Sequence, residues 1–234
     1  KIIISFWGND FYNSNWFDKL INKKFINESH LITFSNMQMK TDFIKRYGDN
    51  NDIKILGGRT GVYGEIQRND MTKRQAKEYF SIPINSIAIT CGYSPKEEQQ
   101  HLGILESIHK NQTNFPNNIF LIFPMTYKGA DENIKNVNQY CKEIGINYKL
   151  FQTFLTDKEV AILRKASDIM IMAAKTDQFS LTMLEYFLTE NTIITGSWLP
   201  YKKLDDLRII RYQIDTISDV GNRVLEAIND WDNN

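Results

Sequence analysis

Two acidic residues and one lysine stand close together in the segment 166–201. Asp177 lies eight positions before Glu185, and Lys175 lies just ahead of Asp177. A strand-like apolar run precedes them and a helix is predicted to begin at 179–180, so the segment passes from strand to loop to helix. In open α/β sheets, ligands bind where such loops leave the carboxyl ends of the strands, and a helix start there attracts phosphate. The segment therefore predicts a binding site in which carboxylates lie beside a phosphate-binding helix start.

The elements that must position this segment are short apolar runs separated by helical stretches. Strands are predicted at 2–6, 31–34, 53–56, 87–91, 119–123, 148–152, 169–172, 192–195 and 208–212. Helices are predicted at 37–47, 72–80, 96–110, 131–144, 157–165, 181–188 and 218–231. Most strands are apolar on both faces, which is typical of a parallel sheet covered by helices on both sides. The regular alternation predicts an α/β chain with a doubly wound parallel sheet.

The stretch between residues 57 and 86 reads as a domain boundary. Its glycines supply turn chemistry, and a charged helix follows before a new strand begins at Ile87. We predict a partial α/β unit at 1–57, a hinge or linker at 58–85 and a complete domain at 86–234. The chain starts inside a strand-like run without a Met or a signal peptide, so we expect a piece of a longer protein.

The composition is ordinary for a soluble globular protein. Lys+Arg and Asp+Glu both total 28, so no overall charge draws the chain to nucleic acid or to an anionic membrane. Cys91 and Cys141 lack a C-x-x-C spacing, and the three histidines lack metal-ligand spacing, which argues against a disulfide scaffold or structural zinc. No apolar run reaches the roughly 18 residues of a membrane-spanning helix. We expect a cytoplasmic protein with no metal site and no nucleic-acid partner.

A second loop with possible chemistry follows the strand at 87–91. Gly92 would let the backbone approach a phosphate, and Ser94-Pro95 is a predicted helix start. An ordinary βα loop looks the same, so the pattern alone leaves both interpretations open. Further along, Pro124 ends another strand and directs Tyr127 to the same edge, where its hydroxyl could bind a ligand or only cover the core.

The spacing of Asp177 and Glu185 resembles the E-x7-E region of GT-B glycosyltransferases, in particular those similar to family 4. Gly92-Tyr93 followed by His101 is similar to the GYN-x-x-x-x-x-x-H pattern of bacterial enzymes in the dTDP-4-acetamido-4,6-dideoxygalactose transferase group. The Pro-Met-x-Tyr stretch at 124–127 resembles the same group. Two departures stand out: an aspartate replaces the first glutamate, and Gln-Phe-Ser replaces the common Gly-Phe-Gly.

The resemblance implies a role for each site residue. Glu185 would accept hydrogen bonds from ribose hydroxyls, Asp177 would contact the sugar, and Lys175 would face the diphosphate. The loop after the strand at 148–152, which carries Phe154 and a predicted helix cap at Asp157, is similar to the one whose backbone reads the nucleobase. The full set of expected donor-binding residues is Gly92, Tyr93, His101, Tyr127, Phe154, Lys175, Asp177, Phe179, Ser180 and Glu185.

Weaker markers extend the resemblance over residues 1–212. Trp7-Gly8-Asn9-Asp10, the stretch 29–35 and the stretch 53–57 each resemble a turn or strand of the amino-terminal GT-B domain, and they occur in the GT-B order. The resemblance therefore implies a Rossmann-like donor-binding domain at 86–234, preceded by the end of an acceptor-side domain. The closing helix at 218–231 would cross back to that domain.

The function implied is transfer of a sugar from a nucleoside-diphosphate donor to a bacterial polysaccharide or a lipid-linked acceptor. It needs no cofactor and no catalytic metal, because helix dipoles, Lys175 and His101 would offset the leaving diphosphate. The catalytic base would lie outside this chain, in the missing amino-terminal part, and so would any peripheral contact with the inner face of a membrane. A GT-B epimerase and a non-catalytic nucleotide-sugar-binding domain stay open as alternatives.

Overall fold

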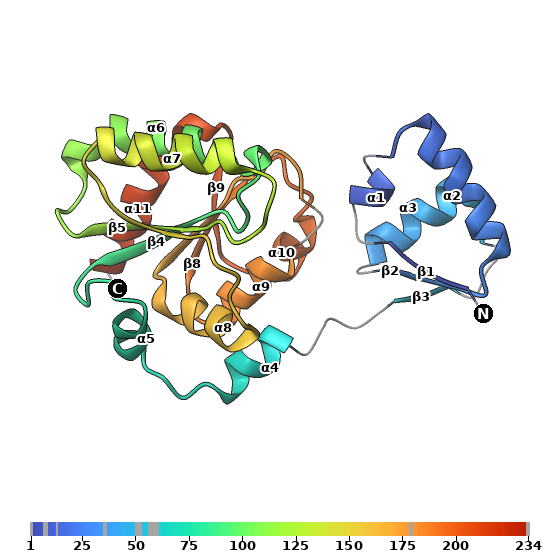
Figure 1. The fold of residues 1–234 in the computed structure, drawn as a ribbon, viewed down its shortest axis with the longest axis horizontal. Coiled ribbons are helices and arrows are strands. Elements are labelled where there is room, and N and C mark those ends of the chain that lie inside the picture. The colour runs from blue at the N-terminus through green and yellow to red at the C-terminus, as the bar shows by residue number, and fades with distance from the viewer. Residues whose placement is uncertain are drawn as a thin grey trace. The chain divides into compact units, whose positions relative to one another are not determined.

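The computed structural model describes residues 2–6, 9–12, 14–34, 37–49, 53–55, 61–177 and 180–232. The chain forms two compact units, Lys1–Arg59 and Thr60–Asn234. Each contains a parallel sheet packed with helices (Figure 1).

The first unit is a three-stranded sheet in the order β1-β2-β3. Its elements are β1 (Ile3–Phe6), α1 (Asn9–Tyr12), α2 (Trp16–Glu28), β2 (Leu31–Phe34), α3 (Met37–Tyr47) and β3 (Ile53–Ile55). The core is rich in phenylalanine, with Phe6, Phe11, Phe34 and Phe43 buried together. The three strands and α3 lie where the sequence predicted strands and a helix, whereas α2 was not predicted. Trp7 and Gly8, on which one family marker rests, lie outside the described residues.

The second unit is a six-stranded parallel sheet in the order β6-β5-β4-β7-β8-β9, which confirms the predicted doubly wound fold. Its strands are β4 (Ile87–Cys91), β5 (Ile119–Pro124), β6 (Asn147–Phe151), β7 (Ile169–Met172), β8 (Thr192–Gly196) and β9 (Tyr212–Ile214). The last strand was predicted at 208–212. The apolar pattern misplaced it because Arg208 adopts a left-handed turn, with φ of 54°, directly after α10 (Lys202–Asp206).

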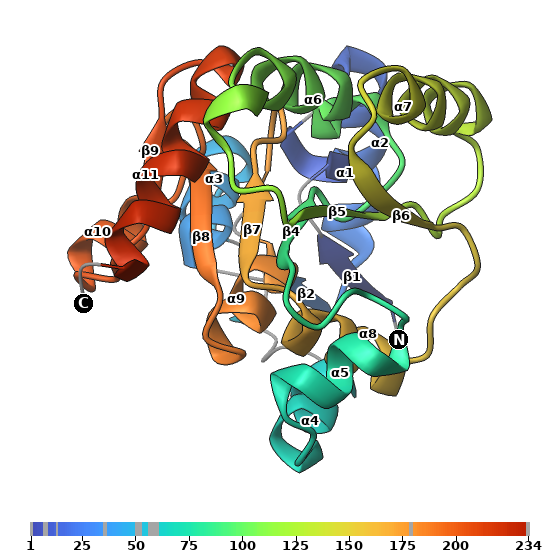
Figure 2. The same ribbon diagram turned by 90° about the vertical axis from the view of Figure 1, so that its left-hand side faces the viewer.

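Helices cover both faces of this sheet (Figures 1 and 2). One face carries α6 (His101–Lys110), α7 (Asp131–Glu143) and α11 (Val220–Asp232), and the other carries α5 (Lys73–Tyr79), α8 (Asp157–Ala166) and α9 (Leu181–Leu188). Neighbouring residues of a strand face opposite sides of the sheet. Ile89 packs in the core with α6, α7 and α11, whereas Ala88 packs in the core with α5 and α8. Both are fully buried, which explains why the strands read as continuous apolar runs.

Residues 61–85, predicted as a hinge or linker, fold with the second unit. They form α4 (Gly61–Arg68) and α5. Ala76, Phe80 and Ile82 are buried in the same core as Ala88 and α8. Two of the glycines that suggested a linker, Gly61 and Gly64, are therefore part of helix α4 of the second unit.

Two predicted helix starts differ in the structure. The helix after β4 begins only at His101, behind a short 3-10 turn, Glu97–Gln99, so Ser94-Pro95 is not its cap. At α8 the cap is Thr156 rather than Asp157. The Thr156 hydroxyl accepts from the Glu159 N–H, and the Glu159 carboxylate accepts from the Thr156 N–H, which makes a capping box.

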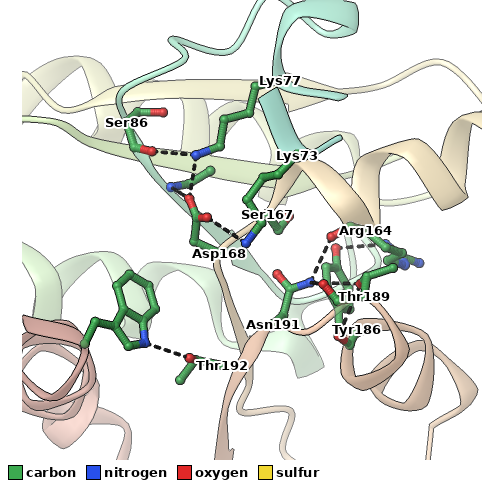
Figure 3. A network of polar contacts seen from close by, with 12 residues as sticks. Lys73, Lys77, Ser86, Arg164, Ser167, Asp168, Tyr186, Thr189, Asn191 and Thr192 are labelled. Atoms are coloured by element: carbon green, nitrogen blue, oxygen red, sulfur yellow. Dashed lines mark hydrogen bonds and ion pairs between the residues drawn. The ribbon is translucent and has the colours of Figure 1, made fainter. Parts of the chain in front are cut away.

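A buried carboxylate ties the amino ends of the central strands to α5 (Figure 3). Asp168 accepts from the ammonium of Lys77 at 2.7 Å, from that of Lys73 at 2.9 Å and from the Ala88 N–H at 2.8 Å. The side chain of Lys77 is only 6 % exposed, and its ammonium also donates to the Ser86 carbonyl. Asp168 thus supplies the charge that allows Lys77 to be buried.

Replacing Asp168 with Ala should lower the free energy of unfolding by about 3–5 kcal/mol, because the Lys77 ammonium would stay buried without a counter-charge. Chemical denaturation measures this. The matched control is Asp206→Ala, which breaks the exposed pair with Lys202 and should leave stability unchanged. Equal effects of the two substitutions would contradict the role given to Asp168.

Candidate functional site

The strand order of the second unit reverses between β4 and β7. The chain winds outward from β4 to β6, returns through α8 to the other side of β4, and winds outward again from β7 to β9. In such sheets a crevice forms outside the carboxyl ends of the two central strands. Gly92 follows β4, and both Lys175 and Asp177 follow β7, so these predicted residues lie at the switch point.

The turn after β4 is held by side chains of the 3-10 segment. Gly92 has φ of +64°, and a Cβ there would come within 2.8 Å of the Gln99 Oε1 and 3.0 Å of the His101 Nε2. A glycine is therefore required by both backbone conformation and space. The Gly92 N–H donates to the Ile171 carbonyl at 3.0 Å, and the Tyr93 N–H donates to Gln99 at 3.1 Å.

His101 lies directly behind this turn and is 1 % exposed. Its Nδ1 lies 3.3 Å from the Asn133 amide nitrogen, which also donates to the Pro95 carbonyl. In the described part of the chain, its Nε2 has no hydrogen-bond partner. Burial lowers the pKa of His101 to about 4, although the nearby Cys91 carbonyl acts in the opposite direction. His101 is therefore neutral at pH 7, and it does not supply the positive charge expected from the sequence.

Asp177 lies at the centre of a hydrogen-bonded cluster. Its carboxylate accepts from the Ser180 N–H at 2.9 Å, from the Tyr93 hydroxyl at 3.3 Å and, in a short contact, from the Tyr201 hydroxyl. Burial and the adjacent Asp177 carboxylate raise the pKa of both tyrosines well above the ordinary value. The tyrosines are therefore protonated donors, and Asp177 joins the loops after β4, β7 and β8.

Backbone N–H groups at the start of α9 are engaged within the protein. The Ser180 N–H donates to Asp177, and the Thr182 N–H donates to the Ser180 hydroxyl at 3.2 Å. The Lys175 N–H donates to the Glu98 carbonyl at 2.7 Å. The N–H groups of Gly92 and Tyr93 also donate within the protein. At these five positions, the amides expected to be free for a phosphate are therefore engaged in internal hydrogen bonds. Phe179 lies outside the described residues.

Three predicted residues expose their side chains on loops that follow strands of this sheet. Lys175 follows β7, Tyr127 follows β5 and is 55 % exposed, and Phe154 follows β6 and is 73 % exposed. Because the carboxyl ends of parallel strands lie at one edge of the sheet, a cation and two aromatic rings are exposed at this same edge. Such side chains can bind an anion and stack on a flat ring.

Glu185 does not contact the Asp177 cluster. Its carboxylate accepts from the Arg164 Nε of α8 at 3.1 Å, and both side chains are mostly buried, with 16 % and 8 % exposed. The Arg164 guanidinium also donates to the Tyr186 hydroxyl at 2.9 Å and lies 4.5 Å from the centre of that ring. The predicted ribose-binding carboxylate is thus one half of an ion pair that joins α8 to α9.

Several residues that build the site were not predicted. Tyr201 reaches Asp177 from beyond β8, and the Trp198 indole donates to the Ala174 carbonyl at 2.8 Å. From the other side, the Gln100 amide donates to the Ala173 carbonyl at 2.6 Å. A Cys, His or acidic spacing cannot reveal such supports, because each of them contacts a loop that is 24 or more residues away in the sequence. The Leu-Pro-Tyr turn after β8 was the one local signal available.

The described residues contain no group of three or more His, Cys, Asp or Glu side chains placed to hold a metal ion. None of the helices that the structure describes has the length and the apolar character needed to cross a membrane.

Comparison with known proteins relates the fold to solved structures. No family model and no curated protein matches the chain. Over 98 % of its length it is similar to HepE of Anabaena in complex with UDP-glucose, with a TM-score of 0.72 and 12 % identity. It spans 63 % of that protein's length.

Two further structures share the fold. One is sucrose-phosphate synthase from Thermosynechococcus elongatus, with a TM-score of 0.67 and 8 % identity. The match covers 97 % of this chain and 58 % of that one. The other is the C-terminal domain of the glycosyl transferase group 1 family protein LpcC from Francisella tularensis, with a TM-score of 0.58, 16 % identity, 69 % of this chain and 84 % of that one. These neighbours are GT-B glycosyltransferases, so the chain has a Rossmann-like arrangement of the GT-B kind.

The buried His101 should make stability fall in acid. Its pKa is about 4 in the folded chain and 6.5 ordinarily, so the unfolded state binds the extra proton. About 3 kcal/mol should be lost as the pH falls from about 6.5 to about 4. Urea denaturation across this range tests this: His101→Gln should flatten the dependence, and His109→Gln, on the exposed part of the same helix, should not. The same slope in both variants would contradict the assignment.

Replacing Glu185 with Ala should lower the free energy of unfolding by about 3 kcal/mol, because Arg164 would be left buried without its partner. Glu185→Gln keeps an acceptor for Arg164 and should cost less. Each variant is denatured chemically and titrated with UDP. If Glu185→Ala is as stable as the wild type, the ion pair with Arg164 does not stabilise the fold. If Glu185→Ala is also weaker in UDP binding, Glu185 contacts the ribose as the sequence predicted.

Proposed function

We propose that this chain is the donor-binding part of a glycosyltransferase, which takes a sugar from a nucleoside diphosphate and transfers it to a glycan or lipid-linked acceptor. The observation that carries the proposal is the switch point between β4 and β7, where Lys175, Asp177 and the Gly92 turn come together. The UDP-glucose bound by HepE, a structure of the same fold, supports a nucleotide sugar as the ligand class.

The chemistry needed from such a domain is to hold the donor and to offset the charge of the departing diphosphate. We assign the charge to Lys175, whose side chain is exposed at the switch point while its N–H is anchored to Glu98. Tyr127 and Phe154 would cover the nucleoside with their rings. His101, being buried and neutral, would act only by supporting the Gly92 turn.

Asp177 is assigned to the sugar end of the donor. Because its carboxylate already holds Tyr93, Tyr201 and the start of α9, it would contact the sugar as part of this cluster rather than as a free carboxylate. On this assignment the aspartate would take the place of the longer glutamate of the family pattern with one carboxylate oxygen held by each tyrosine hydroxyl. No metal is invoked, and the catalytic base is assigned to the acceptor side, beyond this unit.

The finer assignments rest on the sequence resemblance. The Gly92-Tyr93 and His101 pattern and the stretch at 124–127 support a place beside the bacterial dTDP-4-acetamido-4,6-dideoxygalactose transferase group. From this resemblance we infer a polysaccharide or lipid-linked acceptor. We also infer a cytoplasmic location, in which any contact with a membrane would be peripheral.

The test is a titration of the chain with UDP, UDP-glucose, GDP-mannose and dTDP-glucose, followed by thermal shift or calorimetry. At least one of these nucleotides should bind. Lys175→Ala should raise its dissociation constant about tenfold, because a charge-assisted contact is lost. The matched control is Lys135→Ala, an exposed lysine on α7, which should leave binding unchanged. Failure of every nucleotide to bind, or equal affinity in both variants, would overturn the proposal.

A further inference from the structure

The turn after β8 leaves one large aromatic side chain at the surface. Leu199 and Tyr201 are buried in the core that packs against α9, whereas Trp198, two residues beyond the end of the strand, is 38 % exposed. The six-membered ring of its indole lies against Gly196, where a Cβ would come within 2.4 Å of Cε2 and Cζ2. Any other residue at position 196 would therefore displace the ring.

The indole N–H of Trp198 is engaged within the protein. It donates at 2.8 Å to the carbonyl of Ala174, which directly precedes Lys175 on the loop after β7. The ring is therefore held in place, and it offers a ligand an apolar surface without a hydrogen-bond donor. Such a surface suits the face of a pyranose that carries C–H bonds, and it does not bind the hydroxyl groups.

The strand order places Trp198 at one end of the row of loops that line the carboxyl edge. The loops after β6, β5, β4, β7 and β8 carry, in this order, Phe154, Tyr127, Tyr93, Lys175 and Trp198. Neighbouring strands lie about 4.8 Å apart, so three spacings, or roughly 14 Å, separate β5 from β8. In the proposed function the nucleoside lies at Tyr127 and Phe154 and the diphosphate at Lys175, so the sugar lies toward β8.

We propose that the sugar of the nucleotide-sugar donor stacks on Trp198, and that this contact makes the site prefer a nucleotide sugar to the nucleoside diphosphate alone. The Tyr201 hydroxyl, from the same turn, donates to Asp177, which is assigned to the sugar. The sugar thus receives polar contacts from the Asp177 cluster and an apolar contact from Trp198. This inference rests on the proposed donor-binding function and adds the residue that distinguishes the two ligands.

The experiment measures two dissociation constants for each variant by calorimetry. One is that of the tightest-bound nucleotide sugar among UDP-glucose, GDP-mannose and dTDP-glucose, and the other is that of the matching diphosphate, UDP, GDP or dTDP. Trp198→Leu should weaken binding of the nucleotide sugar about fivefold relative to the diphosphate, because the stacking surface is lost. Gly196→Ala keeps the tryptophan but displaces its ring, so it should change the ratio of the two constants in the same direction. Trp198→Phe keeps an aromatic ring without the N–H that reaches Ala174, and it should retain most of the wild-type ratio.

Trp231 on α11 supplies a matched control. It is 39 % exposed, and its indole N–H also donates to a residue of β8, the Thr192 hydroxyl at 3.1 Å, but at the amino end of that strand. Trp231→Leu should therefore leave the ratio of the two dissociation constants unchanged. Far-UV circular dichroism checks that each variant is folded, and Gly196→Ala tests the same surface with the tryptophan kept.

Three outcomes would overturn the role given to Trp198. An unchanged ratio in Trp198→Leu removes the stacking contact but leaves the donor-binding function in place. Equal weakening of both ligands in Trp198→Leu and in Trp198→Phe means that the side chain only supports the loop after β7. If neither a diphosphate nor a nucleotide sugar binds the wild type, the donor-binding function itself fails, and the stacking contact fails with it.

Discussion

The pairing of β4 with β7 is the contact on which the second unit depends. These strands belong to the two halves of the sheet, and their hydrogen bonds are the point where the halves meet. At the amino end, Asp168 bonds the backbone of Ala88 in both directions, and its carbonyl accepts from Thr192 in β8. At the carboxyl end, Gly92 bonds Ile171. Both ends of the pairing between β4 and β7 are thereby fixed by hydrogen bonds.

This rigidity has a chemical cost that shapes the site. The loops at the switch point hold one another through the backbone amides of Gly92, Tyr93, Lys175, Ser180 and Thr182, so in the proposed function side chains would carry the recognition instead. In that proposal Lys175 would bind the anion, and the tyrosines on Asp177 are donors kept protonated by burial. A site of this kind is preorganised, because its loops do not have to be ordered when a ligand arrives.

Elements whose apolar residues face a core could be predicted from the sequence. The predicted bounds of α3, α9, β4 and β7 agree with the structure, because each buries a continuous or periodic apolar pattern. The sequence did not predict α2, whose apolar side faces solvent, nor α4 and α10, which are short. Among site residues, positions next to strand ends could be predicted from topology alone. The pairing of Glu185 with Arg164 could not, because no local pattern relates residues on two different helices.

The seam between β4 and β7 also constrains how the chain is made. Ala88 and Asp168 are 80 residues apart, so the partner of β4 leaves the ribosome about 4–16 s after β4 itself at ordinary rates of synthesis. During that interval β4 can pair with β5, which follows soon after it, but its other edge stays open. An open apolar strand edge invites pairing with other chains. What becomes the centre of the finished sheet is therefore, for several seconds, an open edge at which the nascent chain can misassemble.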